Sequence, residues 1–381
     1  MQCIVLLLQA TSAAALLLSP SSHSSSTSTC TFRHRYAASV IMMSHAYHSQ
    51  DEEPLSSFAA PPKRDTSSNV LILDHYNYNH QQGQHDLLKA FFFDLLALEP
   101  DPRKEENLAA GQGTVWANLA AHQFHLAEGK PDAQVLDGCL TLGYDSLDGV
   151  RSRLGDASEA LTASAFSASD DGSSISLTDP WGSPFRLVSG VEDDARSMQK
   201  NGDTSEARCL VDLALNLPSS TTPAQLRGIG RFYSQVLGCS VASVDDTSVV
   251  IPMGGPVRAD GTPRQTLTYV VSDRSEVHHE DLDVDSEGRG LNRGAHISMY
   301  LEDMRAAYRR ADALGLCYVN HRFKRRAYNE ELAVDQCMFR TLDVVDPDDL
   351  AAGPILRLEH EVRSATNADG SKYKSCPLSL S

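Results

Sequence analysis

The chain has 381 residues, of which 41% are hydrophobic and 22% are charged, a composition typical of globular proteins. At roughly 150 residues per domain, this length predicts two domains. The 33 basic residues against 50 acidic ones leave a formal net charge of −17, which argues against a protein that binds nucleic acid through its phosphate backbone.

The first fifty residues differ from the rest because they contain no Asp or Glu. Two short apolar runs, 3–8 and 13–18, precede a block rich in Ser and Thr. Both runs are too short to span a membrane, and no membrane partner is expected. Such a segment is typical of a targeting signal. We therefore expect residues 1–50 to direct import into an organelle. A plastid is favoured, with a mitochondrion or the secretory pathway as alternatives.

After a Pro- and Ser-rich linker at 51–69, strand and helix signals alternate along the chain. Two signals in the first half mark the ends of elements. Prolines end its first helix, and AspProTrpGly at 179–182 is a turn. Its predicted elements are a strand at 70–79, a helix at 85–98, one or two strands at 114–126, a strand at 139–144, a helix at 146–154, and strands at 175–177 and 184–188.

A polar linker at 191–207 separates this half from a second one with the same order of elements. The second half contains strands at 209–217, 248–252, 266–271, 296–301, 338–344 and 355–360, and helices at 223–237 and 303–314. The helix at 223–237 begins with Pro and is followed by Gly, the usual signals for its two ends. Residues 364–381 are predicted to be a disordered tail.

Two internal echoes indicate that the halves are related. The turn and strand AspProTrpGlySerProPheArgLeu at 179–187 recur as AspPro at 346–347 and GlyProIleLeuArgLeu at 353–358. The strand-then-helix sequence at 140–151 recurs at 297–307. Repeats of this kind indicate a repeated structural unit. The prediction is an α+β protein with four βαβββ units, two in a domain at 70–190 and two in a domain at 208–363.

This order resembles the vicinal oxygen chelate superfamily, which includes glyoxalases, extradiol dioxygenases, and proteins of bleomycin and fosfomycin resistance. The resemblance is carried by the phrases ValTrpAlaAsnLeuAlaAlaHisGlnPheHisLeu at 115–126, AspProTrpGly at 179–182, ArgPheTyrSerGlnValLeuGly at 231–238 and AlaHisIleSerMetTyrLeuGluAspMet at 295–304. It implies that pairs of units curl into open, cup-shaped mixed sheets. In the superfamily's enzymes, strand residues at the bottom of a cup hold a divalent metal ion.

The resemblance assigns four metal-ligand positions to each domain, on the first and last strand of each unit. In the first domain they fall on His75, His125, Cys139 and Arg186. In the second they fall on Asp212, Thr268, His296 and Arg357. Glu359 lies two residues after Arg357 and therefore on the same face of the strand, so it is the alternative ligand there. The metal candidates are accordingly His75, His125, Cys139, Asp212, His296 and Glu359, for Zn, Mn, Fe or Ni.

The arginines at two ligand positions leave a second interpretation open. Arg186 and Arg357 could bind an anionic ligand, or could form ion pairs with Asp on a neighbouring strand. Trp116 is a candidate for stacking on a flat ligand. Gln123 shares a strand face with His125 and is a second ligand-binding candidate. His75 and His125 have the alternative role of hydrogen-bonded structural residues.

The sequence therefore predicts a small-molecule-binding protein, monomeric or homodimeric, without nucleic-acid partners. The resemblance implies a metal-dependent lyase or isomerase of the glyoxalase kind, or a dioxygenase. The alternative is a non-catalytic protein with degenerate metal sites that binds an anionic or aromatic ligand.

Overall fold

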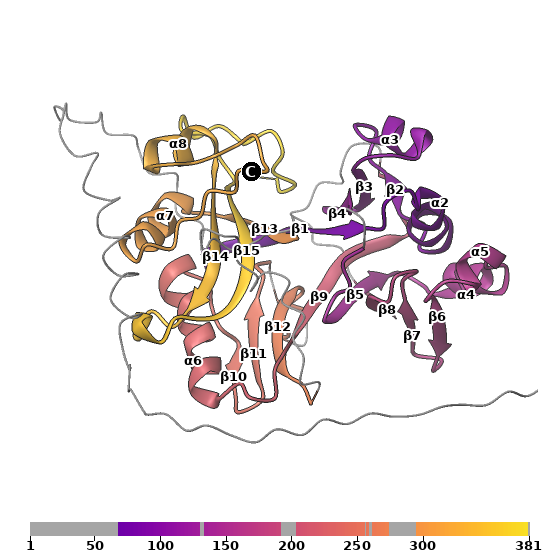
Figure 1. Ribbon diagram of the computed structural model, residues 1–381, viewed down its shortest axis with the longest axis horizontal. Helices are drawn as coiled ribbons and strands as arrows, with labels where there is room; N and C mark the ends of the chain where they lie inside the picture. The colour runs from indigo at the N-terminus through magenta and orange to yellow at the C-terminus, as the bar shows by residue number, and fades with distance from the viewer. Residues whose placement is uncertain are drawn as a thin grey trace, which may run out of the picture. The chain divides into compact units, whose positions relative to one another are not determined.

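The computed structural model describes residues 68–129, 133–191, 203–255, 257–258, 261–273 and 295–379. The predicted targeting segment, the linker at 51–69 apart from its last two residues, and most of the linker at 191–207 lie outside these ranges. In the described part, fifteen strands form one sheet of seven strands and one of eight (Figure 1). The α+β class with open mixed sheets is confirmed.

The first half of the chain forms two βαβββ units. The first unit consists of β1 (Val70–His80), α2 (His85–Leu88) running into η1 (Lys89–Leu95), β2 (Glu99–Pro100), α3 (Glu105–Ala110), β3 (Val115–Leu119) and β4 (His122–Glu128). The second consists of β5 (Gly138–Tyr144), α4 (Asp148–Gly155), α5 (Glu159–Thr162), β6 (Ser167–Asp170), β7 (Ser174–Thr178) and β8 (Pro184–Ser189). In both units the last strand lies parallel to the first.

The second half repeats this arrangement. The third unit consists of β9 (Ala207–Leu217), α6 (Pro223–Arg231) running into η2 (Phe232–Leu237), β10 (Ser243–Val244), β11 (Ser248–Pro252) and β12 (Thr266–Val271). The fourth consists of β13 (His296–Leu301), α7 (Met304–Ala313), α8 (Glu330–Asp335), β14 (Met338–Val345), η4 (Leu350–Ala352) and β15 (Pro354–Ser364). In this unit a single bridge between Cys317 and Thr341 stands where the other units have their first short strand.

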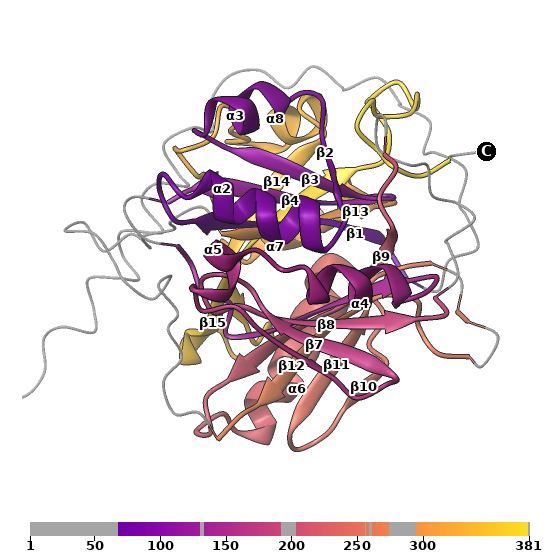
Figure 2. The same cartoon turned by 90° about the vertical axis from the view of Figure 1, so that its right-hand side faces the viewer.

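The units do not combine in sequence order. The seven-stranded sheet has the order β14-β15-β13-β1-β4-β3-β2, so it joins the first unit to the fourth. The eight-stranded sheet has the order β10-β11-β12-β9-β5-β8-β7-β6, so it joins the second unit to the third. Figure 2 separates the two sheets, with β1, β3 and β4 above β7, β8 and β11. The cups predicted within 70–190 and within 208–363 are therefore replaced by two cups that each use both halves of the chain.

Apolar residues on one face of each sheet pack against the helices. On β5, Leu140 and Leu142 are fully buried. Cys139, which directly precedes Leu140, is half-buried on the opposite face. Phe92 of η1 contacts the rings of Phe124 and Phe185, at centroid distances of 5.7 and 6.1 Å. This alternation leaves the other face of each sheet free to carry polar side chains.

The helix that joins β9 to β10 shows how local sequence sets its bounds. The Thr222 side chain accepts a hydrogen bond from the backbone N–H of Gln225, and the Gln225 side chain accepts one from Thr222, which is a capping box. Pro223 occupies the first turn, where no donor is needed. Gly238 ends η2 with φ of 74°, a left-handed conformation that favours glycine.

Residues 365–379, which the sequence analysis placed in a disordered tail, instead fold back onto the first sheet. The backbone N–H of Tyr373 donates to the carbonyl of Ala365, and Thr366 bridges Lys372. Tyr373, Cys376 and Leu378 are buried in a cluster with residues of β1 and β13. The apolar residues near the C-terminus, interrupted by Lys and Ser, are too few for periodicity to reveal this packing. No described helix combines the length and the apolar character that crossing a membrane demands.

Candidate metal centre

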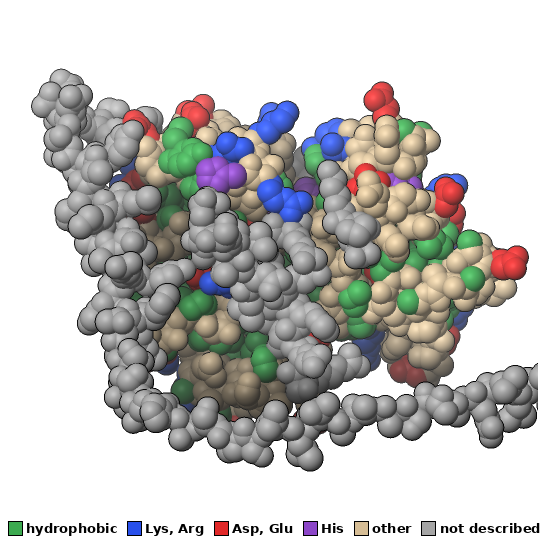
Figure 3. Space-filling view, in the orientation of Figure 1, with side chains coloured by type: hydrophobic (Ala, Val, Ile, Leu, Met, Phe, Trp, Pro, Cys, Tyr) green, Lys and Arg blue, Asp and Glu red, His purple; other side chains and the backbone are tan. Residues whose placement is uncertain are grey.

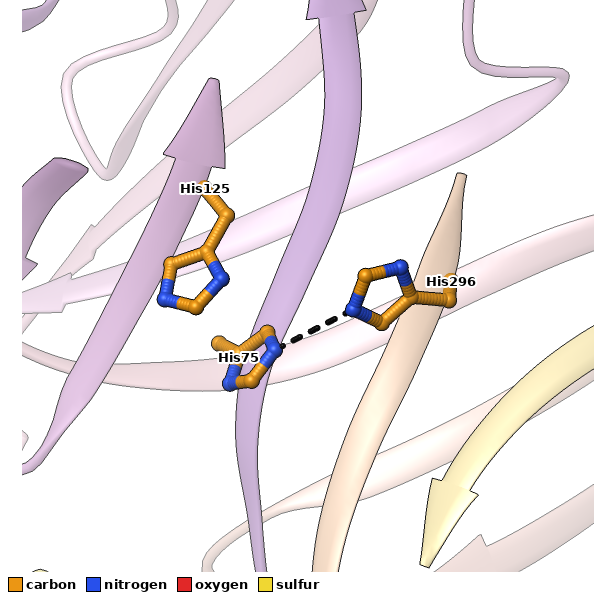
Figure 4. Close-up of side chains that lie close together, drawn as sticks. All are labelled: His75, His125 and His296. Atoms are coloured by element: carbon orange, nitrogen blue, oxygen red, sulfur yellow. Dashed lines mark hydrogen bonds between the residues drawn. The ribbon is translucent and has the colours of Figure 1, made fainter. Parts of the chain in front are cut away.

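Three histidines converge on the polar face of the seven-stranded sheet (Figure 4). His75 lies on β1, His125 on β4 and His296 on β13, which are three adjacent strands. One ring nitrogen from each lies within 4.8 Å of the others. His75 and His296 are 1% and 2% exposed, so water does not reach these two rings freely.

Strand register identifies a fourth member of this site. Tyr76 pairs with Ile297 across the antiparallel strands β1 and β13. The residue before each of them is a histidine, so a local two-fold axis through this pair relates His75 to His296. His125 on β4 lies opposite the residue two after His75. On β15 the corresponding position, opposite Ser298, is Glu361. Glu361 Oε2 is 3.8 Å from His296 Nε2. We call His75, His125, His296 and Glu361 the histidine cup.

The hydrogen bonds of His75 leave one ring nitrogen unprotonated. Its Nδ1 lies 2.8 Å from Oδ2 of Asp74, and because a carboxylate accepts, Nδ1 carries the proton. Nε2 therefore has a lone pair, and it faces His296 Nε2 at 3.4 Å. Two nitrogens about 2.1 Å from one ion at the tetrahedral angle are themselves about 3.4 Å apart. The spacing of this pair suits a shared metal ion.

The tautomer of His125 follows from Gln123. The Gln123 amide nitrogen donates to Oδ2 of Asp101 at 2.8 Å and to Oδ1 of Asn118 at 2.5 Å, which fixes the orientation of the amide. Its oxygen must then accept from His125 Nε2, at 2.7 Å. The lone pair of His125 is consequently on Nδ1. Gln123, expected to contact a ligand, instead orients His125.

Charged groups keep Glu361 ionised. Burial alone would raise the pKa of Glu361, but Arg363 and Arg340 hold it well below its ordinary value. Both arginines donate to its carboxylate oxygens. Burial also lowers the pKa of His75, against the opposing effect of Asp74, so this imidazole stays neutral. The cup thus combines imidazole lone pairs with one carboxylate, and this donor set fits a divalent metal.

Aromatic rings support the imidazoles from two sides. His125 stacks between Trp116 and His75, at centroid distances of 4.6 and 3.8 Å. The His75 and His125 planes differ by only 26°, so their in-plane lone pairs do not point at one common position, and binding a single ion requires one ring to turn. On the other side, Phe323 meets His296 edge to face at 5.3 Å. Trp116 thus lies beside the site but stacks on a histidine.

Basic side chains border these rings. The guanidinium of Arg103 lies 4.7 Å from the Trp116 ring centre, and Lys104 Nζ lies 5.0 Å from it. Arg322, Lys324 and Arg325 are exposed in the segment that carries Phe323. Figure 3 shows Lys and Arg side chains gathered on the upper part of this face.

Four of the six remaining predicted positions lie in the other cup, on the eight-stranded sheet. Leu140 pairs with Leu213 across β5 and β9, and each is preceded by a polar residue, so Cys139 and Asp212 are related as His75 and His296 are. Arg186 and Thr268 occupy the positions of His125 and Glu361. We call Cys139, Arg186, Asp212 and Thr268 the arginine cup. In the described part of the chain, no second group of three metal-ligating side chains converges.

Two predicted positions on β15 do not reach either cup. Arg357 forms an ion pair with Asp343 on β14, with Nε 2.9 Å from Oδ1. Glu359 is fully buried, accepts from Arg340, and accepts from the Asn320 side chain at 2.7 Å. The position on β15 that faces the histidine cup is held by Glu361, which the sequence analysis did not name although its spacing from Glu359 keeps it on the same strand face.

Comparisons with known proteins bear on the fold alone. No protein-family model matches the chain, and no curated protein matches it. Similar solved structures include glyoxalase I from Zea mays, at 12% identity and a TM-score of 0.41, with 77% of this chain and 92% of that chain covered. The 2,3-dioxygenase LapB from Pseudomonas sp. KL28 matches at 13% identity and a TM-score of 0.27, covering 78% and 93%. The Mn(II)-bound glyoxalase from Novosphingobium aromaticivorans matches at 14% and 0.28, covering 78% and 83%.

At these identities and scores the assignment rests on the chain's own strand order and register. Four βαβββ units, paired antiparallel through their first strands, form two cups. The chain has the fold of the vicinal oxygen chelate superfamily. The fold prediction is therefore confirmed.

Proposed function

We propose that this protein is a metal-dependent enzyme of the glyoxalase and dioxygenase kind, acting in the histidine cup on a small molecule with two adjacent oxygen atoms. The observation that carries the proposal is the convergence of three histidines, with ring nitrogens within 4.8 Å of one another. Imidazole-rich sets with one carboxylate suit Zn, Mn, Fe or Ni. Once bound, such an ion polarises substrate oxygens and stabilises the negative charge that develops on them.

The chain's own residues prepare the cup for this role. Asp74 and Gln123 each accept a hydrogen bond from the protonated nitrogen of a histidine, which leaves the lone pair on the other nitrogen. One of the two stacked rings still has to turn before both lone pairs reach a single ion. Arg340 and Arg363 keep Glu361 anionic, which suits a ligand better than a general base, because a base works best with a pKa near the working pH. Because His75 and His296 are buried, water has little access to the part of the cup that these two rings form.

A non-catalytic binding protein is the second candidate. The observation that favours it is that two arginines already pair with Glu361 inside the cup. A carboxylate held in this way is less available to a metal.

Metal content and spectroscopy separate the two candidates. The full chain is incubated with Zn, Mn, Fe or Ni, dialysed and analysed for metal, and Co(II) is added to read imidazole coordination from its visible spectrum. We expect one ion per chain, lost in His75→Ala and retained in His321→Ala, a matched change of an exposed histidine. Retention of metal by His75→Ala would exclude the histidine cup as its site. Metal binding without turnover of thiol-adduct or catechol substrates would favour the binding protein.

A further inference from the structure

The arginine cup uses the same fold positions as the histidine cup but offers different chemistry. Where the histidine cup has the imidazole of His125, the arginine cup has the guanidinium of Arg186. A guanidinium donates five hydrogen bonds and has no lone pair for a cation. The position of His75 is taken by Cys139, whose thiol pKa is raised by burial and by Asp212. A protonated thiol is a poor metal ligand.

One oxygen of the arginine cup's single carboxylate already accepts two hydrogen bonds. Asp212 Oδ1 accepts hydrogen bonds from the hydroxyls of Thr266 and Thr268, at 2.5 and 2.8 Å. These two bonds orient the carboxylate and occupy one of its two oxygens. Within the described part of the chain, Arg186 neither donates a hydrogen bond nor forms an ion pair.

Hydroxyl-bearing residues lie on the two strands beside this exposed guanidinium. Across the sheet, Arg186 lies opposite Ser176, and Ser176 lies opposite Ser169. A cavity of about 320 Å³ opens over this row of residues. Its polar lining consists of Cys139, Ser167, Ser169, Ser176, Thr178 and Arg186, and it includes no carboxylate. One cation and several hydroxyl donors facing a cavity without acidic groups match an oxyanion.

We infer that the arginine cup is a second ligand site, free of metal, that binds a small oxyanion such as a carboxylate or a phosphate monoester through Arg186. The guanidinium supplies charge and paired donors, and the serine and threonine hydroxyls supply further hydrogen bonds. The inference is independent of the proposed metal centre, because the two cups lie on different sheets and share no residue.

Protection of the Cys139 thiol measures occupancy of the cavity. The full chain is treated with iodoacetamide, a neutral reagent, and alkylation of the peptide that contains Cys139 is followed by mass spectrometry. Inorganic phosphate and acetate are the two probes, each titrated at constant ionic strength against chloride. We expect saturable protection by at least one probe, and the stronger one indicates whether the ligand class is a phosphate ester or a carboxylate.

Variants of arginine test the assignment. Arg186→Gln should lower the affinity for the protecting anion by about tenfold or more, since a charge-assisted hydrogen bond is lost. Arg186→Lys should weaken it less, because the charge remains. Arg227→Gln, a change at an exposed arginine of α6, should match the wild type. Protection that does not saturate, or that is equal in wild type and Arg186→Gln, would overturn the proposal. His75→Ala should leave protection unchanged even if it abolishes metal binding, so the two proposals can fail separately.

Discussion

The hydrogen bond between Asp74 and His75 should control metal affinity without touching the metal. Both side chains are almost completely buried, at 2% and 1% exposure, and Nδ1 and Oδ2 are 2.8 Å apart. Loss of such a partner costs about 10- to 100-fold in metal affinity. Asp74→Asn keeps an oxygen that can accept from Nδ1 and loses only the charge, so we expect the lower end, about tenfold. Asp74→Leu removes the acceptor as well, and we expect about 100-fold.

These factors correspond to about 1.4 and 2.7 kcal/mol of binding free energy. The assay is a competition titration, in which Co(II) or Zn(II) is withdrawn from each variant by a chelator of known affinity. Asp343→Asn is the matched control, because Asp343 also accepts a side-chain hydrogen bond at 2.9 Å but lies on β14 with Arg357 as its partner. Equal affinities in wild type and both Asp74 variants, with the control also unchanged, would refute the idea that Asp74 orients a metal-binding nitrogen.

Three further changes test other parts of the structure. Glu361→Gln should weaken metal binding by more than about tenfold, whereas Glu359→Gln should leave it within about twofold, as chelator competition would show; the reverse order would return the ligand position to Glu359. His80 is fully buried, and burial with the neighbouring charge of His85 lowers its pKa to about 4. Because the unfolded chain takes up this proton first, stability falls as the pH drops from 6.5 to 4, and between pH 7.5 and 5 the contribution is about 2 kcal/mol. Urea unfolding of His80→Phe should therefore show a smaller loss over that range, and an identical pH dependence would contradict the assignment. Gly254→Ala places a Cβ 2.1 Å from the Leu71 carbonyl oxygen at φ of 82°, whereas Gly261→Ala at φ of 83° meets nothing within 4 Å. Gly261→Ala should cost about 1 kcal/mol from backbone strain and Gly254→Ala clearly more, measured by urea unfolding.

Local patterns in the sequence were enough to find most of the strands. The strand at 296–301 has the predicted bounds, and the helix begins at Pro223 as predicted. These features depend on alternating apolar residues, proline and glycine, whose effects on the backbone extend over only a few residues. The positions His75, His125 and His296 came from the resemblance to the superfamily, which assigns one position to each of these strands. What local counting could not supply is which units share a sheet, since β1 and β13 pair across more than two hundred residues.

The missed ligand has an equally physical cause. The echo between residues 179–187 and 353–358 aligned Arg357 with Arg186, but the turn of the fourth unit contains the extra helix η4 (Leu350–Ala352). In addition, β15 has 11 residues whereas β8 has 6. The repeated sequence therefore aligns the starts of the two strands and not the residues that face the cups. The position follows instead from the strand register: Ser298, two residues after His296 on β13, lies opposite Glu361 on β15.

The pairing of units also constrains how the two cups can work. Each cup takes two ligand positions from the first half of the chain and two from the second, because β1 pairs with β13 and β5 pairs with β9. Neither half alone contains a complete cup, so the protein cannot be divided between 191 and 207 into two working domains. The same arrangement allows the two cups to differ in chemistry within one fold. Their ligand positions lie on the polar faces of the sheets, where a histidine can be exchanged for an arginine while the apolar residues on the opposite faces, such as Leu140 and Leu213, still form the core.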